Sequence, residues 1–132
     1  MCGFLADLNS EHSVEALRVA GDLIQHRGPD ETVEMSVGAS RFIFHRLAIM
    51  DLSERGRQPL QSADQSVTVV CNGELYNEPE LRASLLSHYS FRSTSDCEVL
   101  LPLYQRGGVE ALTERVEGEF AYVLYDLSLI HI

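Results

Sequence analysis

Cys2 is the first residue whose position could make it reactive. If Met1 were removed, Cys2 would carry a thiol and an α-amino group on the same residue. The α-amino group has a pKa of about 7.7–8.0, so part of it is neutral near pH 7 and can act as a base for the thiol. The position alone also fits an ordinary cysteine at a frayed chain terminus.

Asn72 and Gly73 form the second candidate, directly after the apolar run 67–71. Asn-Gly is a common turn signal, which predicts that a strand ends there. If both groups instead point at one spot, the Asn amide and the Gly N–H could stabilise an oxyanion. The local sequence leaves both interpretations open.

Arg46 and Asp96 are charged residues that could belong to a binding site. Arg46 lies in the apolar stretch 42–50, where an unpaired charge is costly. Its guanidinium group either faces solvent at a strand edge or is available for a carboxylate. Asp96 stands in the first turn of an expected helix, where the helix dipole already favours an acidic residue.

The other reactive side chains show no site pattern. The five histidines and three cysteines have no CxxC or HExxH spacing, so no metal site is expected. Cys71 and Cys97 are expected to pack as small hydrophobic residues. No Walker-type or GxGxxG loop is present, so no nucleotide site is expected in this chain.

Apolar periodicity predicts an α+β domain with clustered strands and clustered helices. The expected strands are 3–8, 32–37, 40–50, 67–71 and 120–125. The expected helices are 14–25, 77–88, 96–106 and 109–115, the last two separated at Gly107-Gly108. Ser13, Asn77 and Ser95 are the expected N-caps, the last two with Glu three residues further on. Pro29 ends the first helix, and 51–65 is expected to be a long loop.

The composition is that of one acidic globular domain. The 132 residues include 20 acidic and 10 basic side chains, for a net charge of −10. This excess argues against nucleic acid or an anionic membrane as a partner. No apolar run of about 18 residues and no signal peptide is apparent. An odd number of cysteines fits a reducing compartment, so a cytoplasmic protein is expected.

Six motifs occur in a specific order along the chain. They are Met1-Cys2-Gly3, His26-Arg27-Gly28-Pro29-Asp30, Arg46-Leu47-Ala48-Ile49, Gln58-Pro59-Leu60, Asn72-Gly73-Glu74-Leu75-Tyr76-Asn77 and Ser95-Asp96-Cys97-Glu98-Val99. Over residues 1–126 this set resembles the N-terminal glutaminase domain of glutamine-hydrolysing asparagine synthetase, a class II glutamine amidotransferase. The resemblance implies the four-layer αββα sandwich of N-terminal-nucleophile hydrolases, with L-glutamine as substrate.

The resemblance also implies the catalytic roles. Cys2 would attack the side-chain amide of glutamine, with its own α-amine as base, and Asn72 with the Gly73 N–H would hold the oxyanion. In the family a histidine commonly stands one residue before His45, where this chain has Phe44. We therefore assign His45 no role, because the amine of Cys2 removes the need for another base.

The implied glutamine site matches the charges of a free amino acid. Arg46 would bind the α-carboxylate, and Asp96 with Glu74 would bind the α-ammonium group. The complete implied set for glutamine is Arg46, Leu47, Ile49, Met50, Asn72, Gly73, Glu74 and Asp96. No metal or cofactor is expected in this chain.

The rest of the family enzyme lies outside these residues. Its synthetase domain binds ATP, Mg²⁺ and aspartate and uses the ammonia to make asparagine, and the whole enzyme is often a homodimer. Two alternatives stay open: an ammonia-supplying domain for another acceptor, or a fragment that binds glutamine without turnover. Residues 127–132 depart from the family pattern, so we interpret 1–126 as a partial domain, incomplete at its C-terminal end, and hypothesise that the tail is foreign to it.

Overall fold

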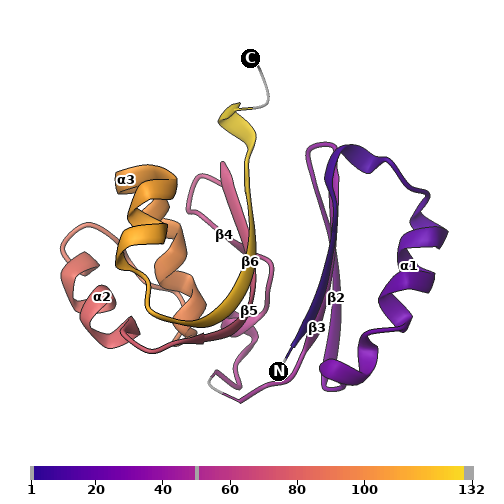
Figure 1. The fold of residues 1–132 in the computed structure, drawn as a ribbon, viewed down its shortest axis with the longest axis horizontal. Coiled ribbons are helices and arrows are strands. Elements are labelled where there is room, and N and C mark those ends of the chain that lie inside the picture. The colour runs from indigo at the N-terminus through magenta and orange to yellow at the C-terminus, as the bar shows by residue number, and fades with distance from the viewer. Residues whose placement is uncertain (1, 50, 130–132) are drawn as a thin grey trace.

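The computed structural model describes residues 2–49 and 51–129. Two antiparallel sheets face each other, and each carries helices on its outer side (Figure 1). The first sheet has the order β1 (Gly3–Asp7), β3 (Ser40–Arg46), β2 (Glu31–Val37). The second has the order β4 (Leu60–Gln61), β5 (Val67–Leu75), β6 (Gly118–Asp126). The helices are α1 (Val14–Asp22), α2 (Glu78–Leu85) and α3 (Leu100–Arg115).

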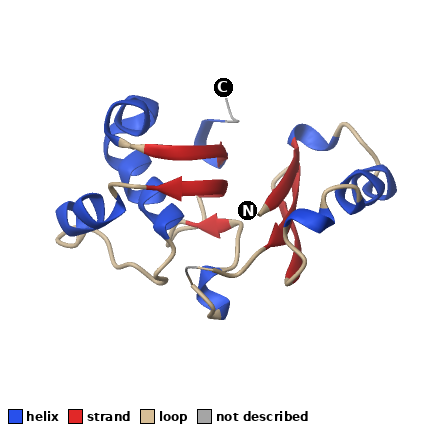
Figure 2. Ribbon diagram, turned by 60° about the horizontal axis from the view of Figure 1, so that its bottom comes forward, coloured by secondary structure: helices blue, strands red, loops and turns tan. Residues whose placement is uncertain are grey.

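The layer order is helix, sheet, sheet, helix. Figure 2 shows the same strands from another direction, between α1 on one side and α2 with α3 on the other. This arrangement confirms the predicted α+β sandwich. It follows from sequence patterning, since each sheet must cover one face with helices and the other with its partner sheet.

The central strand of each sheet divides its side chains between the layers. On β3, Phe42 packs against Val70 and Tyr125 of the second sheet, whereas Ile43 lies against Gly21 of α1. On β5, residues such as Val69 pack under α2 and α3, whereas Val70 faces the first sheet. Because strand side chains alternate, Asn72 points to the same inter-sheet side as Val70.

Residues 72 and 73 do not form a turn, so the prediction that the strand ends there is wrong. β5 continues to Leu75 and pairs with β6 along its whole length, with Gly73 opposite Phe120. Gly73 has φ of +150°, and a Cβ there would lie 2.2 Å from the carbonyl oxygen of Glu119. Pairing with β6 therefore overrides the local turn preference, and only glycine fits.

Several other predicted boundaries move. The first helix ends at Asp22 instead of 25, and β3 ends at Arg46 instead of 50. Segment 51–65 holds β4 and a 3₁₀ turn, so it is not all loop. The predicted 96–106 and 109–115 helices are a 3₁₀ turn followed by one helix, α3, which kinks at Gly108.

Only one of the predicted caps is made by its side chain. Ser13 accepts the Ala16 N–H, as predicted. Asn77 and Ser95 make no side-chain cap. Asn77 instead accepts the Glu117 N–H at 3.0 Å, because the pairing of Leu75 with Gly118 at the end of the β5–β6 ladder brings residue 117 beside it.

Candidate functional site

A cavity of about 300 Å³ lies where β1, β3 and β5 approach one another. Its volume is at the small end of the range for small-molecule sites. The predicted site residues that line it are Cys2, Arg46, Leu47, Ile49, Asn72, Gly73, Glu74 and Asp96. Met50 lies outside the described residues. A larger hollow of about 880 Å³ near Tyr89 contains none of the predicted residues.

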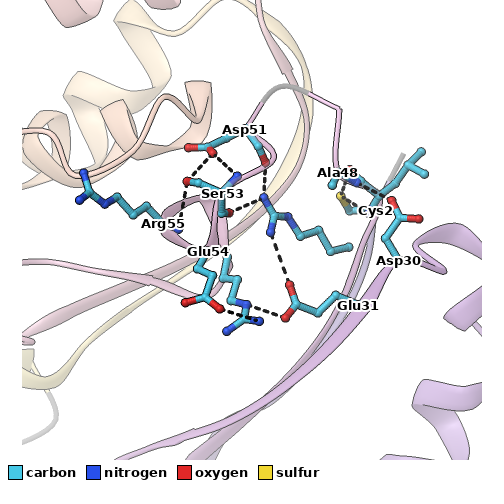
Figure 3. A network of polar contacts seen from close by, with 11 residues as sticks. Cys2, Asp30, Glu31, Ala48, Asp51, Ser53, Glu54 and Arg55 are labelled. Atoms are coloured by element: carbon cyan, nitrogen blue, oxygen red, sulfur yellow. Dashed lines mark hydrogen bonds and ion pairs between the residues drawn. The ribbon is translucent and has the colours of Figure 1, made fainter.

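Cys2 enters this cavity directly before β1. Its Sγ accepts the Leu47 N–H at 3.3 Å and lies 3.7 Å from the Leu47 carbonyl oxygen (Figure 3). The side chain of Arg27 donates to the Cys2 carbonyl oxygen at 3.2 Å. The half-buried thiol therefore lies against Leu47, directly after β3, while Arg27 holds the backbone of Cys2.

The segment 26–30 supports this end of the cavity from behind, a role that sequence reasoning missed. Asp30 accepts the Ala48 N–H at 2.8 Å, and its own N–H donates to the Arg46 carbonyl oxygen at 3.0 Å. A Cβ on Gly28 would lie 2.1 Å from the His45 carbonyl oxygen, so the segment packs backbone to backbone. The available signal was the motif His26-Arg27-Gly28-Pro29-Asp30, in which sequence reasoning finds a helix break and a family motif without a structural role.

Arg46 is a buried cation with three partners. Its side chain is 8% exposed, and it donates to Glu31 at 3.4 Å and to the Ser53 carbonyl oxygen at 3.0 Å. It also donates to the Asp51 carbonyl oxygen, and Figure 3 labels the three partners, Glu31, Asp51 and Ser53. Glu31 is shared with Arg57 at 2.5 Å. Buried charge is tolerable only with such pairing, so Arg46 is not an edge residue facing solvent.

Asp51 joins the Arg46 loop to the Asp96 loop. Its carboxylate accepts from the Ser53 N–H at 2.8 Å and from the Thr94 N–H at 2.9 Å. Hydrogen bonds from the Ser53 side chain and then from Thr94 lower the pKa of Asp51 to about 2, against the cost of burial. Local sequence could not reveal this link, because 43 residues separate the two partners.

Asp96 lines the same cavity as Arg46. It is 8% exposed, and its Oδ2 accepts the Leu75 N–H at 3.0 Å. Glu74 is exposed at the rim. Asp51 and Glu119 also line the cavity, so one buried cation, Arg46, lies among four carboxylates. A site with both signs of charge matches a zwitterionic ligand.

Asn72 contributes a polar group without a partner. Among residues 2–49 and 51–129, nothing hydrogen-bonds its buried Oδ1. Buried polar groups are nearly always paired, so an unpaired one beside a cavity calls for an explanation. A bound ligand that donates a hydrogen bond to this oxygen, as the NH₂ of a carboxamide can, would provide it.

The other two thiols also border the cavity but are buried, in agreement with their predicted packing role. The contact with Cys71 and then burial raise the pKa of Cys97 well above its usual value. Cys97 is therefore a neutral thiol near pH 7, unlike a nucleophile. Cys2 is the thiol of the cavity that solvent reaches.

The described part of the chain contains neither a metal-binding cluster nor a membrane-spanning helix. It holds no group of three or more His, Cys, Asp or Glu residues that could bind a metal ion. It also holds no helix long and apolar enough to cross a membrane.

Comparison with known proteins places this cavity in context. A family model described as "Glutamine amidotransferase domain" matches residues 1–131. The chain is 38% identical over 135 residues to asparagine synthetase [glutamine-hydrolyzing] 2 of Bacillus subtilis, covering 96% of this chain and 17% of that protein. It is 39% identical over 130 residues to the Arabidopsis thaliana asparagine synthetase 1, covering 96% and 22%.

A relative that is named for a different activity is equally similar. The "Amidase chyE" of Penicillium rubens is 39% identical over 123 residues, covering 93% of this chain and 18% of that protein. The chain thus spans about a fifth of the length of these relatives.

Among solved structures, the glutamine phosphoribosylpyrophosphate amidotransferase of B. subtilis matches 66% of this chain and 21% of its own, with a TM-score of 0.54 and 23% identity. That likeness supports the sandwich fold. The match of the family model over nearly the whole chain shows that this protein belongs to the glutamine amidotransferase domain family.

Proposed function

We propose that this chain hydrolyses the side-chain amide of L-glutamine, with Cys2 as the nucleophile. The observation that carries the proposal is one small cavity lined by the Cys2 thiol, the Asn72-Gly73 peptide, and the opposite charges of Arg46 and Asp96. Glutamine carries the matching groups, an amide at one end and a zwitterion at the other. The family membership supports the same substrate.

Arg46 would bind the α-carboxylate and Asp96, with Glu74, the α-ammonium group. Leu47, Ile49 and the neighbouring backbone would surround the aliphatic part. Holding both charges of the head group leaves the amide one direction in which to extend, toward Cys2. Such positioning turns the attack into an effectively intramolecular step.

The reaction needs a free α-amine on Cys2, and therefore the loss of Met1. The amine takes the proton of the thiol, and the thiolate attacks the amide carbon. The oxyanion would receive hydrogen bonds from the Asn72 amide and the Gly73 N–H, and each such donor is worth about 10²–10³ in rate. The ammonium returns its proton to the departing nitrogen, the C–N bond breaks, and water then hydrolyses the thioester to glutamate.

In the whole protein, we propose that the ammonia serves ATP-dependent asparagine synthesis from aspartate, as the names of the relatives suggest. ATP and Mg²⁺ would be bound by sequence outside these residues. The similarity to an amidase leaves a second candidate, in which the ammonia or the hydrolysis serves another product. The acceptor is chosen outside the glutaminase domain.

Intact mass and a glutaminase assay on the purified 132-residue chain test the proposal together. We expect a mass without Met1 and release of glutamate and ammonia in equal amounts. Full activity in a preparation that retains Met1 would contradict the role of the amine as base. A processed chain that releases no glutamate would contradict the proposal for this chain.

A further inference from the structure

The open edge of β5 has a backbone partner over only two residues of β4. The register pairs Leu60 with Val69, so two residues further along the same register Gln58 stands opposite Cys71. β4 begins only at Leu60, two residues after Gln58. The ladder that would continue toward Asn72 therefore stops as a backbone ladder before Cys71.

The side chain of Gln58 replaces the missing strand at that point. Its Oε1 accepts the Cys71 N–H at 2.6 Å, and its Nε2 donates to the Cys71 carbonyl oxygen at 3.0 Å. These are the two bonds that the backbone of a paired residue would make in an antiparallel ladder. Gln58 is 6% exposed, so its amide is fully committed to this contact.

Asp96 replaces the strand again further along. Its Oδ2 accepts the Leu75 N–H at 3.0 Å. Between these two side chains lies Gly73. On the other edge, the Tyr76 N–H donates to the Glu117 carbonyl oxygen, so even-numbered residues of β5 bond to β6.

Alternation along the strand then directs the Gly73 N–H to the open edge. No acceptor among the described residues meets it there, and Gly73 lines the cavity. Side chains thus occupy the open edge on both sides of Gly73 and leave that N–H unbound.

We infer that Gln58 is a positioning residue for the oxyanion site: it fixes the Cys71 peptide beside Asn72 and keeps the Gly73 N–H directed into the cavity. The inference rests on the proposed function, in which this N–H donates to the oxyanion. Because the oxyanion forms only in the transition state, loss of Gln58 should lower kcat and leave the KM for glutamine nearly unchanged.

The test compares Gln58→Met with Gln61→Met in the glutaminase assay. Gln61 is a matched control, because its Nε2 donates to the Thr68 Oγ1 at 3.2 Å between the same two strands and it does not line the cavity. We expect kcat to fall by about 10- to 100-fold in Gln58→Met, less than the loss of a whole oxyanion donor, and by less than about twofold in Gln61→Met.

The aldehyde analogue of glutamine separates positioning from general damage. It forms a tetrahedral thiohemiacetal with the nucleophilic thiol and so places an oxygen in the oxyanion position at equilibrium. Gln58→Met should weaken binding of the aldehyde by the same factor as kcat. Binding of the product glutamate, which has no such oxyanion, should stay the same.

A second variant guards against a Gln58→Met chain that does not fold. The carboxyl group in Gln58→Glu offers one donor and one acceptor when protonated, as the amide does, but only acceptors when ionised. The kcat ratio of Gln58→Glu to wild type should therefore rise as the pH is lowered.

Three outcomes are distinguishable. Equal kcat and aldehyde binding in Gln58→Met and Gln61→Met would overturn the inference alone, as would a Gln58→Glu ratio that does not change with pH. Wild-type chain that neither releases glutamate nor binds the aldehyde would instead contradict the proposed function on which the inference rests. A kcat loss confined to the Gln58 variants would support both.

Discussion

The two ends of the cavity differ in how their polar groups are used. At the end proposed for the amino-acid head group, the side chains of Arg46 and Asp96 already bond to protein partners. At the end proposed for the amide, Asn72 keeps an unpaired buried oxygen, and the Gly73 N–H meets no acceptor in the described ranges. The first end thus holds buried charges that are bonded to the protein, whereas the second holds polar groups that have no hydrogen-bond partner.

The difference has a physical reason. Buried charges must be paired at all times, so a head-group site needs a surrounding network that persists without ligand. The Gly73 N–H can donate to an oxyanion only when negative charge develops, so a bond made earlier would reduce its effect. The free Asn72 oxygen is an acceptor and is left for the NH₂ group of an amide ligand. In the proposed function, neighbouring residues hold the groups that bind the head group. The groups that take part in the chemistry must instead stay free of protein partners.

The largest expected effect concerns Cys2. Cys2→Ala should lower the glutaminase rate by more than about 10⁴-fold, as loss of a covalent nucleophile does in other enzymes. In the wild type, brief iodoacetamide treatment at pH 8 should label Cys2 and remove activity while Cys97, whose pKa is raised, stays unlabelled. Peptide mass mapping checks this, and equal labelling of Cys97 would contradict the assignment.

The next effect concerns the head-group end. Arg46→Lys should raise the KM for glutamine about 10- to 100-fold, because a lysine cannot reproduce a fork of charged hydrogen bonds. Arg57→Lys is the matched control, since Arg57 shares Glu31 but does not line the cavity. Its KM should change by less than about twofold, as for other exposed ion pairs. Equal KM shifts in both variants would place substrate binding elsewhere.

The smallest effect concerns the link between the two loops. Asp51→Asn should raise the KM about three- to tenfold by loosening the tie to Thr94, whose contribution is that of one charged hydrogen bond. Asp64→Asn is the control, because Asp64 binds Ser62 and Ser66 in a similar turn outside the cavity and has a pKa also lowered to about 2. Its KM should not change.

The same pair predicts a pH effect on stability. Both carboxylates have a pKa lowered from 3.8 to about 2 in the folded chain, so the stability that each contributes is present above about pH 4 and is lost as the pH falls toward 2. Denaturation midpoints should therefore differ most between wild type and either variant near pH 5 and converge near pH 2. A difference that grows toward pH 2 would contradict the depressed pKa values.

Sequence reasoning predicted the residues that line the cavity better than the parts that hold them. Residue type and position made Cys2, Arg46 and Asp96 candidates, and the family resemblance implied their roles. The supports were missed because they join residues distant in the chain: Arg27 to Cys2 across 25 positions and Gln58 to Cys71 across 13.

The sequence by itself determined the strand and helix segments, through apolar periodicity, and the chemical types available for a site. Only the tertiary structure decided that β5 continues through Asn72-Gly73, since its pairing with β6 outweighs a local turn preference. It also decided which polar groups of the cavity have hydrogen-bond partners in the protein and which have none. Turn and cap preferences act over a few residues, whereas the packing of two sheets determines which distant polar groups meet.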